Sequence, residues 1–192
     1  MPFLLRLIAP IDRLSLALAG LLRWGVLLAV VLSAANALLR KTLDLGSNAL
    51  LEGQWYLFAA VFLLGAGPVL LRNGHVRIDV LAQRFGLRVQ ALIDVIGLLL
   101  VVLPLCLLLI ELSWPLFAEA WRSGEASANA GGLPRWPAWA LLPLGFGLLA
   151  LQAGAELLRR LAFLTGALPS PYAAVATPLA DTAALPAGAP RP

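Results

Sequence analysis

Residues 95–110 read VIGLLLVVLPLCLLLI, with Asp94 before the run and Glu111 after it. The run is apolar on every side of a helix, whereas a surface helix of a soluble protein carries a single apolar stripe. It also lacks the strict alternation of a strand in a membrane barrel. A membrane-spanning helix needs about 20 residues. With its flanking residues, this stretch therefore predicts a transmembrane helix at about residues 91–112.

Three more uncharged runs occupy residues 24–39, 55–71 and 137–155. Extended by their flanks, they predict spans at about residues 22–40, 53–72 and 137–158. Composition agrees, because 61% of the 192 residues are hydrophobic and 12% are charged, against roughly half and a quarter in soluble domains. The fold class predicted is therefore an all-α integral membrane protein, with four transmembrane helices in a membrane domain of residues 1–166.

The two ends of the chain differ from the spans. Residues 2–22 carry Arg6, Asp12 and Arg13 among apolar side chains, and two arrangements are open: a separate N-terminal interfacial helix or a tilted extension of the first span. No clean small-residue cleavage site follows a short apolar stretch, so the first apolar segment is expected to stay in the mature protein. Residues 167–192 are rich in Pro, Ala, Thr and Gly, which predicts a disordered cytoplasmic tail.

Orientation is predicted from the basic residues, which are enriched on the cytoplasmic side of membrane proteins. Ten of the 14 basic residues fall on the side of the two termini: Arg6, Arg13, Arg23, Arg72, Arg77, Arg84, Arg88, Arg159, Arg160 and Arg191. The prediction is a multi-pass protein of the bacterial inner membrane with both termini in the cytoplasm. Because these side chains lie between apolar runs and not on one soluble face, a nucleic acid is not an expected partner.

Few residues have the chemistry of a catalytic or metal site. His75 is the only histidine and Cys106 the only cysteine, whereas catalysis needs a base, a nucleophile or a metal held in a fixed geometry. A haem anchor would need histidines inside the spans. We therefore expect no enzyme activity, no cofactor, no metal and no substrate-binding residue, with Cys106 as a packed thiol.

Small residues and prolines in the spans indicate how the helices pack. Glycines that predict close helix approach are Gly65, Gly67, Gly145, Gly147 and Gly154. Prolines that predict bends are Pro68, Pro104 and Pro143. Near the inner end of the fourth span, Gln152 lies one turn from Glu156, which is spaced to pair with Arg160. A solvated helix end and a subunit contact both remain open for this pair.

The loop after the second span reads RNGHVRIDV over residues 72–80. An Asn-Gly pair typically ends a helix, and in a new helix His75 and Asp79 would share one face. The segment predicts an amphipathic connector whose basic residues meet anionic lipid headgroups. A ligand-binding role for His75 is the alternative.

The run H-V-R-I-D at residues 75–79 closely resembles the signature segment of the small permease subunit, DctQ type, of tripartite ATP-independent periplasmic (TRAP) transporters. The second outer loop, EASANAGGLPRWP at residues 125–137, is similar to the E-x-S-x-N-x-G-G-L-P-x-W-P form of one family branch. The first span departs from the pattern, since it ends in Arg40-Lys41 where many members have Arg-Tyr. The resemblance covers about residues 11–164.

The resemblance also implies which residues serve as family-motif, structural or subunit-contact positions. They are Glu52, His75, Arg77, Asp79, Glu125, Asn129, Gly131, Gly132, Pro134, Trp136, Gln152 and Glu156.

For function, the resemblance implies a non-catalytic small membrane subunit of a secondary transporter. Such a subunit scaffolds the large permease subunit, which carries out sodium-coupled uptake of an organic acid delivered by a periplasmic substrate-binding protein. The expected partners are those two proteins and membrane lipids. A stand-alone, homo-oligomeric small channel or carrier is the alternative, and it would need a polar pore face built from Ser33, Asn36 and Gln152.

Overall fold

The computed structural model describes residues 2–44, 46–72 and 85–169. Its helices are α1 (Pro2–Thr42), α2 (Asn48–Leu71), α4 (Leu87–Gly97), α5 (Leu103–Ser123) and α6 (Trp136–Leu164), and the π-helix η1 (Leu98–Val102) joins α4 to α5. Within the described residues, four helical rods are long and apolar enough to cross a membrane: Arg6–Thr42, Asn48–Leu71, Leu87–Ser123 and Trp136–Leu164. The prediction of an all-α chain with four candidate spans is confirmed.

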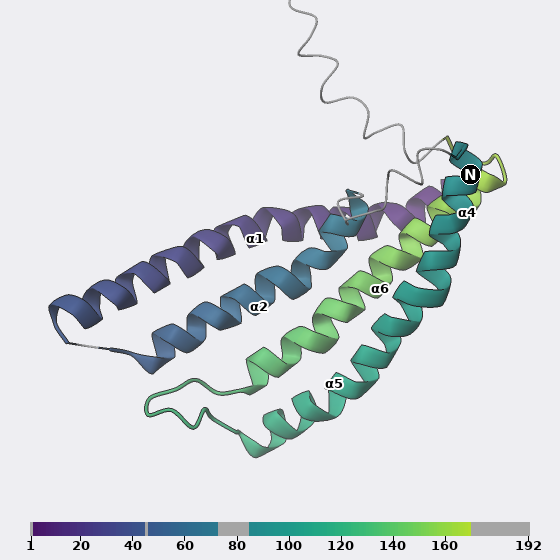
Figure 1. Cartoon of the computed structure of the whole chain (residues 1–192). Helices are drawn as coiled ribbons and strands as arrows, with labels where there is room; N and C mark the ends of the chain where they lie inside the picture. Colours follow the sequence, from purple (N-terminus) through teal and green to yellow (C-terminus); the bar gives the residue numbers. More distant parts are fainter. Residues whose placement is uncertain (1, 45, 73–84, 170–192) are drawn as a thin grey trace, which may run out of the picture.

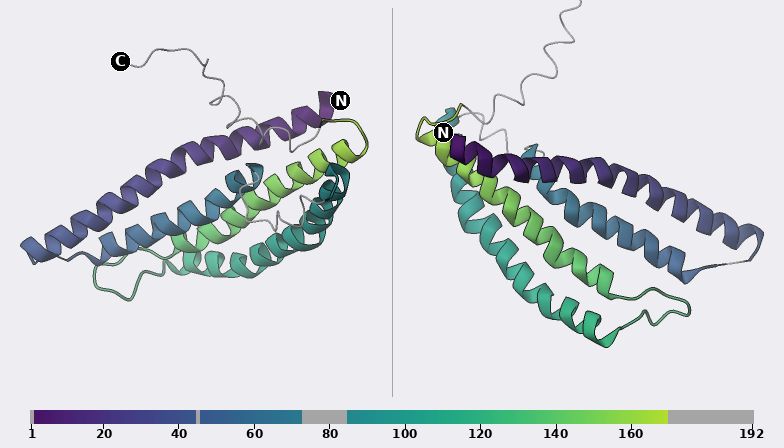
Figure 2. Two further views of the ribbon diagram at one scale, coloured as in Figure 1. Left: turned by 45° about the horizontal axis from the view of Figure 1, so that its top comes forward. Right: turned by 180° about the vertical axis from the view of Figure 1, so that it is seen from behind.

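The four rods lie side by side as a curved layer in the order α1, α2, α6, α5 (Figures 1 and 2). The most extensive helix contacts are those between α1 and α2, α2 and α6, and α5 and α6. Buried residues make up 33% of the most apolar stretch of α6 but 11% of that of each other rod. Helix α6 is therefore the centre of the packing. The rods converge where α1 begins and α6 ends, and they spread apart toward the loops at the other end (Figure 1).

Helix α1 runs without a break from Pro2 to Thr42. At 1.5 Å per residue its length is about 60 Å, roughly twice the hydrocarbon core of a bilayer. Of the two arrangements open for residues 2–22, the structure has the continuous extension of the first span. This extension is long enough to bring Asp12 and Ser15 beside the end of α6.

The third rod changes its hydrogen bonding just before Pro104. In η1 the N–H of Leu103 donates to the carbonyl of Leu98, five residues back. Proline has no N–H and its ring crowds the carbonyl four residues earlier, so a helix commonly loosens by one π-turn at such a site. The rod curves along its length (Figure 1), in agreement with the bend predicted at Pro104.

Gly145 lies at a tight contact between α6 and α2. A Cβ atom at this position would lie 2.7 Å from the Leu63 Cβ and 3.0 Å from the Leu63 carbonyl oxygen. At Gly147 and Gly154, in contrast, a Cβ would meet nothing within 4 Å among the described residues. The prediction of close approach is therefore confirmed at Gly145, whereas no described residue approaches Gly147 or Gly154 closely.

Specific caps end the helices that border the loops. The Ser47 side chain accepts a hydrogen bond from the N–H of Leu50, so α2 begins five residues before the predicted start of the second span. At the end of α6, Gly166 has a φ of 75°, and the N–H of Ala167 donates to the carbonyl of Ala162. This is the left-handed glycine cap of a Schellman motif. Most of the tail predicted from residue 167 onward, residues 170–192, lies outside the described residues.

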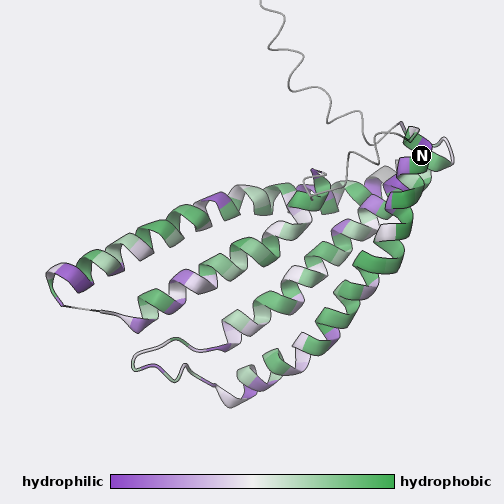
Figure 3. Cartoon of the chain, in the orientation of Figure 1, coloured by the Kyte–Doolittle hydropathy of each residue, from purple (hydrophilic) through white to green (hydrophobic). Residues whose placement is uncertain are grey.

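The rods are apolar along most of their length (Figure 3), and many of their large apolar side chains are exposed. Phe62 is 80% exposed, Leu100 67% and Phe58 66%. Such side chains in water would form a large unfavourable apolar surface, whereas in lipid they face hydrocarbon. The exposed side chains therefore suit a helix layer that lies in a bilayer.

Candidate functional site

The loop between α5 and α6 folds back on itself. It leaves α5 through Gly124, whose φ is 64°, and an isolated antiparallel bridge joins Ala126 to Pro134. The Ser127 N–H donates to the Leu133 carbonyl over 3.0 Å, and the Arg135 N–H donates to the Glu125 carbonyl over 2.9 Å. These bonds give residues 124–135, here called the outer loop, a defined shape.

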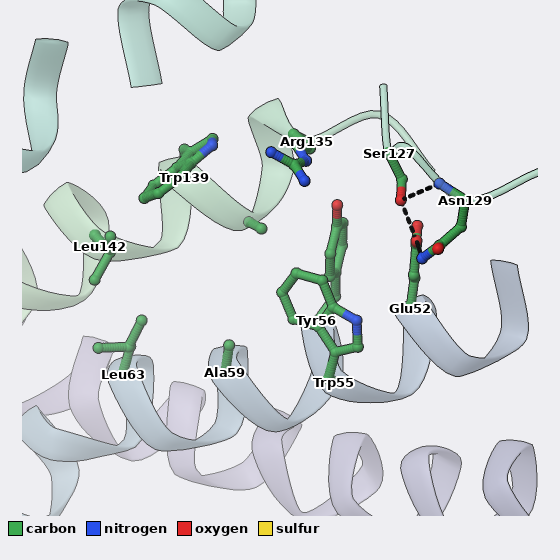
Figure 4. A pocket seen from close by; sticks show the side chains of 11 residues that line it. Glu52, Trp55, Tyr56, Ala59, Leu63, Ser127, Asn129, Arg135, Trp139 and Leu142 are labelled. Carbon is green, nitrogen blue, oxygen red and sulfur yellow. Dashed lines mark hydrogen bonds between the residues drawn. The ribbon is translucent and has the colours of Figure 1, made fainter. Parts of the chain in front are cut away.

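Glu52 in the first turns of α2 holds this loop from below (Figure 4). Its Oε2 accepts the Leu133 N–H over 2.6 Å, and its Oε1 accepts the Asn129 side-chain amide over 2.9 Å. The Ser127 hydroxyl donates to the same Oε1. Only 4% of Glu52 is exposed, so one nearly buried carboxylate receives three donors from the outer loop. Hydrogen bonds to an ionised acceptor are about twice as strong as neutral ones.

Glycine is required where the loop meets this carboxylate. A Cβ at Gly132 would lie 2.5 Å from the Ser127 Cβ and 3.0 Å from the Glu52 Oε1. Gly131 has a φ of 71°, a backbone region that side chains with a Cβ rarely adopt. The two adjacent glycines of the motif thus serve different needs, one for space and the other for backbone conformation.

Further contacts fasten the middle and the C-terminal end of the loop to α2. The Tyr56 hydroxyl donates to the Pro134 carbonyl over 3.0 Å, and the Asn48 amide donates to the Ala130 carbonyl over 3.0 Å. Glu125 and Arg135 form an exposed ion pair at 2.8 Å, which contributes little stability by itself. Because its anchors point inward, the loop keeps an exposed outer surface.

Two aromatic rings join the helices that flank the loop. Trp136, the first residue of α6, packs edge to face on Trp121 of α5 with ring centroids 4.7 Å apart. Such pairs stabilise packing by about 0.5–1.5 kcal/mol beyond the area they bury.

A cleft of about 480 Å³ opens between α2 and α6 below the loop. Figure 4 shows Glu52, Ser127, Asn129 and Arg135 at its polar end, with Ala59, Leu63 and Leu142 at its apolar end. The polar groups at this mouth already have partners within the chain. The cleft is therefore a space between α2 and α6, and the outer loop holds these two helices together at one end.

A second polar cluster, here called the inner network, lies at the opposite end of the layer. Arg160 is fully buried. Its Nε donates to the Asp94 Oδ2 of α4 over 2.8 Å, and its Nη1 pairs with Glu156 one turn back on α6. The predicted pairing of Glu156 with Arg160 is confirmed.

The inner network continues from α6 to α1. Arg159 pairs with Asp12 of α1 at 2.6 Å and also with Glu156. The Ser15 hydroxyl donates to the Gln152 Oε1 over 2.7 Å, and the Gln152 amide donates to Asp12 over 3.2 Å. Every buried side-chain nitrogen and oxygen in the described residues has a partner, as an apolar surrounding requires.

The inner network bears on one of the two alternatives left open for Gln152 and Glu156, the solvated helix end. They are 0% and 1% exposed, so neither is a solvated helix end, and their partners are residues of this chain. The two side chains form part of an internal junction among α1, α4 and α6. Charges within a membrane domain are costly unless paired, and pairing across three helices meets that requirement.

The predicted site residues therefore divide into three sets. The outer loop and its anchor contain Glu52, Glu125, Asn129, Gly131, Gly132, Pro134 and Trp136. The inner network contains Gln152 and Glu156. His75, Arg77 and Asp79 lie outside the described residues.

Sequence reasoning missed several partners of these residues. Tyr56 and Asn48 bind backbone carbonyls of the loop, a role that carries no signal in a sequence. Asp12, Asp94 and Arg159 in the inner network did carry a signal, because each is a charge beside or within an apolar segment and such a charge needs a partner.

Both clusters use their polar groups for contacts within the chain. Among the described residues, no group of three or more His, Cys, Asp or Glu side chains is placed to hold a metal ion. The arrangement favours mechanical fastening of helices over the binding or conversion of a small molecule.

Comparison with known protein families finds a match over most of the chain. A family model described as "Tripartite ATP-independent periplasmic transporters, DctQ component" matches residues 29–163. The matched region contains the last third of α1, all of α2, α4 and α5, the outer loop and nearly all of α6. Comparisons with curated proteins and with solved structures find no match.

Proposed function

Because the chain belongs to the DctQ component of the tripartite ATP-independent periplasmic transporters, we propose that it scaffolds the large permease subunit of such a transporter in the membrane. The chain is the small, multi-pass membrane component and is not catalytic. We further propose that the assembled transporter takes up an organic acid coupled to sodium, with the acid delivered by the periplasmic binding protein. Those two steps belong to the partner subunits.

The observation that carries the scaffold proposal is the internal closure of both polar clusters. Glu52 holds the outer loop with three donors, and Arg160 is bound between Asp94 and Glu156. A transported solute would need polar groups that can exchange partners. A static support instead needs helices that keep their arrangement while a partner moves beside them.

The proposed contact with the large subunit is tested by co-purification. This chain carries a tag and is expressed together with the large permease subunit of the same transporter. The tagged chain is then purified in mild detergent. The two should elute as one complex. Elution of the tagged small subunit without the large permease would contradict the scaffold proposal.

The homo-oligomeric channel is less well supported by the same residues. Asn36 is 5% exposed and its Oδ1 accepts the Ser47 N–H over 3.3 Å, and Gln152 is fully buried against Ser15. Two of the three polar side chains that a pore face would need are therefore engaged in packing. Solute flux through liposomes that contain only this chain would favour the channel.

We also propose that the outer loop helps to dock the periplasmic binding protein. The loop is exposed but held by Glu52, so little conformational entropy is lost when a partner binds. Reversing two nearby charges, Glu119→Lys with Glu125→Lys, should slow association and change its salt dependence, because rim charges steer encounter. Surface plasmon resonance with the binding protein measures both effects, and Ala128→Ser is the uncharged control. Association rates equal to wild type would exclude these charges from docking.

A further inference from the structure

A groove of about 260 Å³ lies between α1 and α2, away from both polar clusters. Its walls are apolar and include Leu22, Val61 and Gly65. Two arginines line the same groove: Arg23 from the interior of α1, and Arg72, which follows the last residue of α2. The groove therefore has apolar walls and two positively charged side chains.

Neither arginine has a carboxylate partner in the described part of the chain. The ion pairs there are formed by Arg135, Arg159 and Arg160. Arg23 donates through Nε to the Gly20 carbonyl over 3.1 Å, a neutral acceptor, so no described residue compensates its charge. Arg23 also belongs to a candidate membrane span, where an isolated charge is costly and is normally paired.

We propose that this groove binds an anionic phospholipid, with the phosphate held by Arg23 and Arg72 and one acyl chain lying between α1 and α2. Guanidinium groups suit phosphate because they present parallel N–H donors. Basic pockets between transmembrane helices commonly recognise anionic headgroups.

The dimensions of the groove fit a lipid of one leaflet. Between Val61 and Arg72 helix α2 rises by about 16 Å, close to half of the ~30 Å hydrocarbon core. The arginine at the end of α2 marks the headgroup level, and the apolar walls extend from there toward the bilayer centre. An acidic side chain of a protein partner would pair with the two arginines, but it would not fill the apolar part of the groove.

Bound lipid is measured on the purified full chain in mild detergent by native mass spectrometry. The chain is titrated with phosphatidylglycerol and, separately, with phosphatidylcholine. Wild type should bind phosphatidylglycerol more tightly than phosphatidylcholine. The variant Arg23→Gln with Arg72→Gln should bind phosphatidylglycerol roughly 30-fold more weakly, since each basic residue contributes about a factor of five.

Two sets of variants separate this effect from net charge and from misfolding. Arg6→Gln with Arg13→Gln removes the same charge from exposed positions of α1 outside the groove and should leave the preference for phosphatidylglycerol unchanged. Gly65→Leu retains both arginines but narrows the groove, where the nearest atom to a new Cβ is the Leu22 Cδ1 at 3.7 Å. It should weaken lipid binding several-fold.

Several results would overturn the proposal. Equal affinity of wild type for both lipids is one, and a phosphatidylglycerol affinity of the groove variant equal to that of the Arg6 and Arg13 control is another. If the groove variant lost the large subunit on co-purification yet bound phosphatidylglycerol as wild type does, the arginines would serve a carboxylate of the protein partner. Should Arg23→Gln with Arg72→Gln fail to fold, Gly65→Leu with wild-type lipid affinity would still refute the lipid site.

Discussion

Single side chains carry most of the structural specificity at the two ends of the layer. Glu52 binds three donors of a loop that lies about 80 positions later in the chain. Arg160 joins two acidic residues of different helices. In a molecule whose surfaces are otherwise apolar, such polar contacts are directional, whereas apolar contacts between helices tolerate rotation and sliding.

Replacing Glu52 by glutamine should release the outer loop. Glutamine presents one acceptor and two donors, so the donors of Leu133, Asn129 and Ser127 can no longer all be satisfied. Protease cleavage within residues 124–135 should become roughly tenfold faster, the factor expected for the loss of about one charge-assisted hydrogen bond. Time-resolved proteolysis in detergent measures this rate. Glu119→Gln, an exposed change at the end of α5, is the control, and equal cleavage of Glu52→Gln and wild type would contradict the prediction.

Removing Arg160 should destabilise the whole chain. Breaking a buried ion pair by removing one partner costs about 3–5 kcal/mol, because the remaining charges stay buried. We expect Arg160→Ala to lower the thermal midpoint strongly and Arg160→Lys to lower it less, since lysine keeps the charge but lacks the planar fork. Cys106 is the only cysteine and is 1% exposed, so a thiol-reactive dye reports unfolding directly.

The control for Arg160 is Arg122→Ala, an exposed position on α5. It should change the midpoint little. If Arg160→Ala melted at the same temperature as Arg122→Ala, the inner network would not contribute to stability.

At the scale of the elements, backbone chemistry decides how closely the helices approach and where they bend. The π-turn of η1 precedes Pro104, and α6 packs tightly on α2 at Gly145. The first feature arises because proline lacks a backbone N–H, and the second because glycine lacks a Cβ.

Gly145→Ala should separate α6 from α2. The new Cβ would lie 2.7 Å from the Leu63 Cβ, and such overpacking costs about 1–3 kcal/mol. Gly147→Ala is a closely matched control on the same helix, because a Cβ there meets nothing within 4 Å among the described residues. The thiol-dye assay should show a lower midpoint for the first variant only. Equal thermal midpoints of the two variants would mean that α6 and α2 accommodate the added methyl group without loss of stability.

The whole molecule is a layer with two edge helices, α1 and α5, and a central α6. Its described residues leave large apolar surfaces on both faces, and lipid or a protein partner can cover them equally well. A layer of this kind presents a broad flank to a partner, whereas a closed four-helix bundle buries most of its apolar surface inside. This shape is consistent with the proposed supporting role beside a larger permease.

Orientation is a prediction at this scale. In a Cys106→Ser background, Ala128→Cys in the outer loop should react with a membrane-impermeant maleimide in intact spheroplasts. Ala184→Cys near the C-terminus should react only after lysis, since the basic residues favour cytoplasmic termini. Reaction of both positions after lysis shows that each thiol is accessible. Labelling of Ala184→Cys in intact spheroplasts would reverse the proposed orientation.

The sequence by itself determined the class of the protein, the number of candidate spans, the motif residues of the outer loop and the family resemblance. Hydropathy, helix-capping residues and helix-breaking residues are local properties, so they can be recognised within a short stretch of sequence. The pairing of Glu156 with Arg160 was also predictable, because four residues along a helix always return to the same face.

Only the tertiary structure decided the order α1, α2, α6, α5 and the partners across it. Ser15 meets Gln152 and Asp12 meets Arg159 over separations of 137 and 147 positions. An apolar helix surface does not specify its neighbour, because lipid and another helix are nearly equivalent to it. The pairing was settled by the polar side chains that must find partners in an apolar medium, and those partners are known only once the chain is folded.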